Sequence, residues 1–251
     1  MVFIIQLNMD ILIIVCFFII SYLYASVGHG GASGYLALMA FLNFDPALMR
    51  SSALILNVLV SSIAFIQFYR GGHFHFKKLI PFIILSIPMA YIGSGIHINS
   101  HLYKIILGIC LLFAIAKILH KNFFKPADFV LKPIPFFPAM GIGSLLGFVS
   151  GLIGIGGGII LSPILLIMRW ATIKETAAIS AAFILFNSLS GISGLWIQNS
   201  FSLNIPPLWI VAAVSGGLIG SWSGSFKINS LRLSYILASI LLMASIKLFL
   251  L

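Results

Sequence analysis

Two short glycine-rich stretches contain the residues of this chain whose types and spacing could do chemistry. Residues 27–33 read VGHGGAS, and residues 153–159 read IGIGGGI. Both lie in apolar segments, where glycines interrupt a helix and bring backbone N–H groups close to a ligand. Those donors suit an oxyanion, because the N-terminus of the short helix after each break carries a partial positive charge. A shift of 126 residues superimposes Gly28, Gly30 and Gly31 on Gly154, Gly156 and Gly157.

Polar side chains in and near the breaks extend this predicted site. His29 lies inside the first break, where it could donate to an anion or carry a coupled proton. Asn57 and Asn187 lie about three turns into the helix after each break, where each could bind cargo or only hold helices together. The glycines themselves could instead serve close helix packing. The predicted substrate-binding residues are Gly28, His29, Gly30, Gly31, Ser33, Asn57, Gly154, Gly156, Gly157, Gly158 and Asn187.

The elements that must position these residues are apolar helices. The chain is 61% hydrophobic and only 7% charged, whereas about a quarter of the residues in a soluble domain are charged. Two broken segments, 11–43 and 137–169, contain the glycines. The other segments approach the roughly 20 residues needed to cross a bilayer, and they are 46–69, 78–96, 101–119, 172–197, 207–226 and 231–251. We therefore expect an all-α polytopic membrane protein with about eight hydrophobic membrane segments.

The repeated spacing predicts two homologous halves. Each half has one glycine-broken helix and three transmembrane helices, so residues 1–119 form the first repeat and residues 137–251 the second. Residues 120–136 form a basic linker that contains several prolines. A duplicated membrane segment with matching helix breaks is the best indication in a sequence of a transporter's binding site.

Two topologies are compatible with the broken segments. If each crosses the membrane once, the repeats are parallel and the basic residues divide weakly between the two sides. If each is a re-entrant hairpin, the repeats are inverted, and only Arg50, Lys104 and Lys247 among the basic residues lie outside. The positive-inside rule favours the inverted arrangement.

Other chemistries find little support in the sequence. His73 and His75 have no nearby acid or cysteine, so we expect no metal site. Ser193 lies in a GISG motif like that of rhomboid proteases, but no histidine follows His120, so we expect no enzyme. A nucleotide-binding GxxxxGK[ST] motif is absent, and we expect no cofactor. No segment combines enough Lys and Arg with aromatic residues to bind nucleic acid.

The glycine motifs resemble those of a known family. The sequence GIGGG at 154–158, followed by Pro163, and the matching GHGG at 28–31 are similar to motifs of the TauE/SafE family of sulfite exporters. The resemblance spans essentially the whole chain. It implies a multi-pass plasma-membrane protein linked to the export of sulfite, sulfoacetate or related organosulfur anions.

We therefore expect a secondary carrier that exports a small anion by alternating access at a midplane site formed by both breaks. Its partners would be that anion and the membrane lipid, and its location the cell membrane. Two alternatives remain: a non-transporting assembly or maturation partner with the same fold, and an anion channel. The sequence does not fix the oligomeric state.

Overall fold

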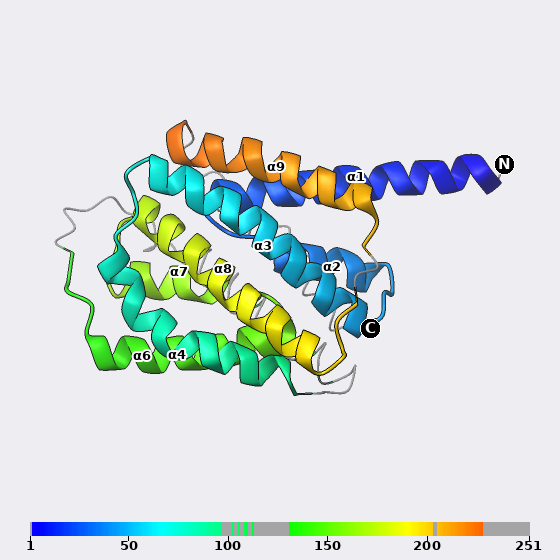
Figure 1. The fold of residues 1–251 in the computed structure, drawn as a ribbon. Helices are drawn as coiled ribbons and strands as arrows, with labels where there is room; N and C mark the ends of the chain where they lie inside the picture. The colour runs from blue at the N-terminus through cyan, green and yellow to red at the C-terminus, as the bar shows by residue number, and fades with distance from the viewer. Residues whose placement is uncertain are drawn as a thin grey trace.

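All regular structure in the described part of the chain is helical. The computed structural model describes residues 2–96, 131–202 and 205–227, with side chains from residue 11, and single positions between 102 and 112. Apart from those single positions, the predicted segments 101–119 and 231–251 lie outside it. The helices, shown in Figure 1, are α1 (Val2–Ser26), α2 (Ala32–Phe41), α3 (Pro46–Arg70), α4 (Phe76–Ser94), α6 (Phe136–Ile153), α7 (Gly158–Ile167), α8 (Ile173–Ile197) and α9 (Pro207–Phe226).

The lengths of these helices agree with a polytopic membrane protein. Among the described residues, α3, α4, α6, α8 and α9 are long and apolar enough to cross a membrane. Helices α2 and α7 have 10 residues each, which is too short to span the hydrocarbon core. Each short helix follows a glycine break, as the sequence predicts. The all-α polytopic fold class is confirmed.

The long helices α3 and α8 begin at strong local signals. The Asp45 carboxylate accepts a hydrogen bond from Ala47 N at 2.8 Å, and Pro46 occupies the first helical position. At α8, Thr172 and Glu175 form a reciprocal capping box, in which each side chain accepts from the other's backbone N–H. These contacts satisfy N–H groups that have no partner within the helix.

At each break the chain turns back on itself. In the first half, Ser33 Oγ donates to Tyr24 OH at 2.7 Å, and further along α2 the Tyr35 ring stacks on Phe17 at 5.3 Å. Helix α2 therefore runs back along α1. In the second half, Lys132 N donates to Arg169 O at 2.8 Å, so the chain before α6 and the chain after α7 meet at one end of the molecule. Both broken segments have the hairpin form that a re-entrant arrangement requires.

Helices α3 and α8 lie side by side at the centre and run antiparallel (Figure 1). Leu54 faces Gly191, and Asn57 Nδ2 lies 3.4 Å from Ser188 Oγ. At the other end, Phe68 clusters with the first turns of α8. Sequence numbers therefore rise along one helix as they fall along the other. Because the repeat equates α3 with α8, this geometry supports inverted halves.

Each flank of the molecule pairs a helix of one half with a helix of the other (Figure 1). Helix α4 packs on α6, and helix α1 packs on α9. In both pairs a row of glycines lets the two backbones touch, since an added Cβ would collide with a facing carbonyl oxygen. The colliding pairs are Gly143 with Phe82, Gly147 with Ser86, Gly151 with Ala90, Gly216 with Phe18, Gly220 with Tyr22 and Gly224 with Ser26.

This exchange of helices has a consequence for the predicted domain organisation. The two sequence repeats are not separate bodies in the described part of the chain, because the first helix of each packs on a later membrane segment of the other. The repeat boundaries at residues 119 and 137 stay a prediction.

Candidate functional site

The two glycine breaks meet at the side chain of Asn57 on α3. A Cβ added to Gly30 in the first break would collide with Asn57 Oδ1. A Cβ added to Gly156 in the second break would lie 2.7 Å from Asn57 Nδ2. Asn57 is fully buried. Residues predicted from opposite halves of the sequence therefore surround one amide group.

Helix α2 begins at this amide, and helix α7 begins two residues after Gly156, which contacts it. Asn57 Oδ1 accepts a hydrogen bond at 3.1 Å from Ala32 N, the first residue of α2. Helix α7 begins at Gly158 without a side-chain cap, and a Cβ there would press on Ile184. Each start presents first-turn N–H groups and the positive end of a helix dipole. Two such ends near one buried point form a favourable environment for an anion.

The two breaks share a left-handed backbone conformation at two of their three matched glycine pairs, while in the third pair Gly156 has a positive φ and Gly30 does not. Gly28 and Gly154 have φ angles of 78° and 86°, and Gly31 and Gly157 have φ angles of 92° and 72°. Residues with a Cβ rarely adopt these left-handed angles. The conformation of each chain reversal therefore depends on glycine, beyond the space that glycine leaves for close packing.

Gly28 and Gly154 serve the packing of the hairpins more than the contact with Asn57. Gly28 lies against the backbone of Ala177 near the start of α8, and Gly154 lies against the backbone of Arg50 near the start of α3. These are matching positions in the two halves, since the start of α3 corresponds to the start of α8. The tip of each hairpin therefore packs against the central helix of the opposite half, the first against α8 and the second against α3.

His29 connects the first break to the second half through hydroxyl groups. Its Nδ1 lies 3.0 Å from Val27 O, and its Nε2 lies 3.0 Å from Ser162 Oγ on α7. Ser162 Oγ in turn lies 2.7 Å from Ser180 Oγ on α8. All three side chains of this row are buried, with His29 only 7% exposed.

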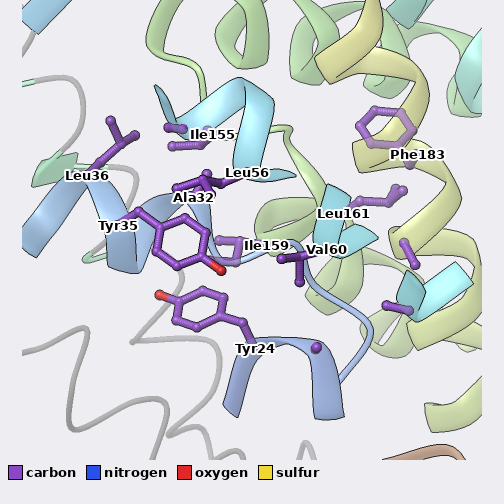
Figure 2. Packing of buried hydrophobic residues seen from close by; sticks show 14 of the residues in the cluster. Tyr24, Ala32, Tyr35, Leu36, Leu56, Val60, Ile155, Ile159, Leu161 and Phe183 are labelled. Atoms are coloured by element: carbon purple, nitrogen blue, oxygen red, sulfur yellow. The ribbon is translucent and has the colours of Figure 1, made fainter. Parts of the chain in front are cut away.

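Apolar and aromatic side chains enclose the breaks (Figure 2). Gly31 packs against the Tyr35 ring, whose nearest atom would lie 2.7 Å from a Cβ added to the glycine. Gly157 packs against the Phe183 ring in the same way, at 2.9 Å. Ile155 and Ile159 belong to the same buried cluster as these aromatic residues. Such an enclosure excludes water and strengthens electrostatic interactions within it.

Two of the predicted site residues donate hydrogen bonds to other protein groups, Ser33 between two helices and Asn187 within one helix. Ser33 donates to Tyr24 OH and so joins α2 to α1. Asn187 Nδ2 donates to Phe183 O within α8 at 2.8 Å, while its Oδ1 is buried without a hydrogen-bond partner. An unsatisfied buried acceptor is costly unless a ligand or water occupies it.

The sequence analysis missed three residues of this region. Ser162 and Ser180 carry no repeat signal, since the shift of 126 residues pairs them with leucines. Arg50, to which the sequence analysis assigned no role in the site, is 9% exposed beside Gly154. Its guanidinium donates to Ser94 O at 2.7 Å and to Gly151 O at 3.0 Å, at the C-terminal ends of α4 and α6. The negative ends of two helix dipoles stabilise the cation there.

A second charged group joins the halves near the start of α8. Lys78 Nζ on α4 lies 2.8 Å from Glu175 Oε1, and His75 Nδ1 lies 3.4 Å from the same oxygen.

Burial and the neighbouring Lys174 lower the pKa of His73 in the loop before α4. Within the described ranges, no three His, Cys, Asp or Glu residues gather closely enough to hold a metal ion.

A family model described as sulfite exporter TauE/SafE matches residues 13–248. The chain belongs to the TauE/SafE family. The probable membrane transporter protein y4hK of Sinorhizobium fredii is 35% identical over 236 residues, which cover 93% of this chain and 96% of that protein. The probable membrane transporter protein MJ0441 of Methanocaldococcus jannaschii is 28% identical over 146 residues, or 56% of this chain and 52% of that protein. No solved structure matches.

Membership of the TauE/SafE family decides the broad function. The protein is a membrane transporter and not an enzyme, and the resemblance found in the glycine motifs is confirmed. The apolar helices of this TauE/SafE transporter fit a multi-pass protein in lipid.

Proposed function

We propose that this transporter carries a small anion, such as sulfite or an organosulfonate, by alternating access at a site between the two glycine breaks. The observation that carries the proposal is the position of Asn57, whose amide contacts Gly30 and Gly156 at once. A cargo held there would touch both hairpins. Movement of one hairpin tip at a time would then open the site to one side of the membrane.

The chemistry of the site favours a negative charge. Backbone N–H groups at the starts of α2 and α7 and the Asn57 Nδ2 group can donate to an oxyanion. Asn187 Oδ1 is an acceptor that could receive a hydroxyl or amino group of a larger organosulfonate. The acidic residues whose side chains are described, Asp45 and Glu175, both cap helices.

Export in the cell membrane follows from the charge of the cargo. An inside-negative potential drives an anion outward with about 2.3 kcal/mol per charge for each 100 mV. A carrier with this site therefore exports an anion without ATP. The sequence contains no nucleotide-binding motif that would provide another energy source.

Flux into proteoliposomes tests this function. Purified protein is reconstituted and supplied with sulfite, sulfate, thiosulfate, sulfoacetate or taurine. Saturable flux of one of the anions, with counterflow, supports the carrier, and loss of that flux in Gly156→Leu supports a cargo site at the breaks. Gly141→Ala is the matched control, because nothing lies within 4 Å of a Cβ at Gly141.

The same assay separates the alternatives. Flux that rises linearly with concentration and shows no counterflow indicates an anion channel. Absence of flux for every anion, from protein shown to be folded, contradicts transport of sulfur oxyanions. A membrane assembly partner then becomes the better interpretation, and Gly156→Leu should leave its complex intact.

A further inference from the structure

We propose that His29 binds a proton that crosses the membrane together with the anion, one proton for each anion. This inference rests on the proposed function, because it assigns the coupling ion of the same site. It depends on three contacts, between His29 and Val27, between His29 and Ser162, and between Ser162 and Ser180.

The hydrogen-bond partners of His29 accommodate both protonation states. The Val27 carbonyl oxygen can only accept, so His29 Nδ1 carries a hydrogen in either state. In the neutral ring, Nε2 accepts from the Ser162 hydroxyl. In the imidazolium, Nε2–H donates to Ser162 Oγ at 3.0 Å, and the Ser162 hydroxyl turns to donate to Ser180 Oγ at 2.7 Å.

Rotation of two hydroxyl groups therefore keeps His29 hydrogen-bonded when the proton binds and when it leaves. If His29 only held the first break against α7, a partner that always donates or always accepts would be sufficient at its Nε2. A serine is suited to a changing partner because its hydroxyl both donates and accepts. The row of hydroxyls also extends from the first break through α7 to the central helix α8.

Charged groups on the helices near His29 have hydrogen-bond partners other than His29. Glu175 on α8 pairs with Lys78 on α4, and Lys174 donates to Ser225 O. Arg50 on α3 donates to carbonyl oxygens of α4 and α6. The buried Tyr24 hydroxyl accepts a hydrogen bond from Ser33 Oγ, and α7 contains no titratable residue.

Electrostatics couple the proton to the cargo. The His29 ring contacts Ser162 in the first half of α7, the short helix whose start forms part of the proposed anion site, so an imidazolium lies close to that site. An anion bound there stabilises the protonated ring, and by linkage the protonated ring binds the anion more tightly. The loaded carrier therefore moves both together. A proton taken up from water on one side is released to water on the other, and no bond of the anion changes.

In a coupled carrier, the sum of the electrochemical gradients of the anion and of the proton sets the direction of net flux. With a divalent anion, one negative charge remains uncompensated, and an inside-negative potential still drives export. An acidic exterior opposes export and, in vesicles, drives uptake. This response to pH distinguishes proton coupling from a simple uniporter.

The test uses proteoliposomes whose membrane potential is held at zero with potassium and valinomycin. Thiosulfate and sulfoacetate are the probes, since both stay fully ionised between about pH 6 and pH 8. With the exterior one pH unit more acidic, accumulation of up to about tenfold is expected at a ratio of one proton per anion. A pH dye inside the vesicles counts the protons directly.

Variants locate the coupling. His29→Gln and Ser162→Ala are expected to lose accumulation driven by the pH gradient, to a greater degree than flux driven by the anion gradient. His73→Gln, a histidine in a surface loop, should accumulate the probe like the parent. Proton counting on the unaltered protein tests whether a proton moves with each anion, even where a variant fails to fold.

Saturable anion flux without proton movement would overturn the coupling and leave the proposed function standing. Equal pH-driven accumulation in folded His29→Gln would likewise remove His29 from the role. Absence of any anion flux would overturn the transport proposal and this inference with it.

Discussion

Asn57 and Gly156 touch across the boundary between the two halves, although 99 positions separate them in the sequence. The same amide accepts from Ala32 N at the start of α2. One side chain therefore contacts both hairpins. In a carrier that opens one hairpin at a time, such a residue would lose one of its two contacts whenever either side opens.

Replacement of Gly156 by alanine is expected to abolish most of the flux. Its φ of 75° disfavours a Cβ by about 1–2 kcal/mol, and the new methyl group would press on Asn57 and Ile184. Overpacking adds about 1–3 kcal/mol. Thermal unfolding and flux are measured together, with Gly141→Ala as the control. Unchanged flux in Gly156→Ala would exclude a role of the second break in transport.

The two asparagines are expected to respond differently to substitution. Asn57→Ala leaves the buried Ala32 N–H without its acceptor, which costs about 1–3 kcal/mol of stability. Asn187→Leu removes an acceptor that has no partner, so its effect on stability should be within about 1 kcal/mol. Chemical unfolding of both variants beside the parent measures the difference.

Flux decides whether Asn187 belongs to the site. If its Oδ1 contacts cargo, Asn187→Leu lowers flux by at least about tenfold, the equivalent of one lost hydrogen bond, while the unfolding temperature stays near that of the parent. Parental flux in this variant would assign Asn187 to α8 packing alone.

The glycine row on α6 is expected to be essential for folding. Gly147→Val places a branched side chain where the backbone of Ser86 now lies, and α4 and α6 must separate. We expect loss of more than about 3 kcal/mol, above the usual range for a single substitution. Gly141→Ala, on the same helix but facing open space, again provides the comparison. A stable Gly147→Val protein would contradict the close α4–α6 contact.

The ion pair between Lys78 and Glu175 is expected to contribute modestly. Their side chains are 24% and 13% exposed, and such partly exposed pairs are worth up to about 1 kcal/mol. Glu175→Gln is informative because glutamine also completes a capping box. A double-mutant cycle of Glu175→Gln with Lys78→Met isolates the pair. A coupling energy near zero would show that only the cap at Thr172 matters.

The hairpin form of the second broken segment is expected to place residues 132 and 169 on one side of the membrane. Single cysteines replace Lys132 and Arg169 in a chain whose native Cys16 and Cys110 are changed to serine. An impermeant maleimide should label both positions from the same side. Labelling from opposite sides would mean that α6 and α7 together cross the membrane once.

Much of the helical framework could be predicted from local sequence. The start of α3 follows from Asp45-Pro46, and the start of α8 from the capping residues Thr172 and Glu175. The observed bounds of α9 equal the predicted segment 207–226. These features depend on hydrogen bonds between neighbouring residues and on apolar length, which a sequence displays directly.

The candidate site was predictable only in part. The glycine pattern identified both breaks, because their left-handed conformation and close packing require glycine. The pattern did not identify Ser162 or Ser180, since a serine in an apolar helix has no distinctive spacing. It also gave Asn57 and Asn187 equal weight, and the structure places only Asn57 between the breaks.

The sequence by itself determined that this chain is an all-helical membrane protein with two matching helix breaks, because composition, length and glycine spacing are local properties. The tertiary structure alone decided that α1 pairs with α9 and α4 with α6, and that His29 meets Ser162. Those contacts join residues that lie far apart in the sequence. Their geometry depends on how closely backbones approach across glycine rows, which is settled only when the helices pack together.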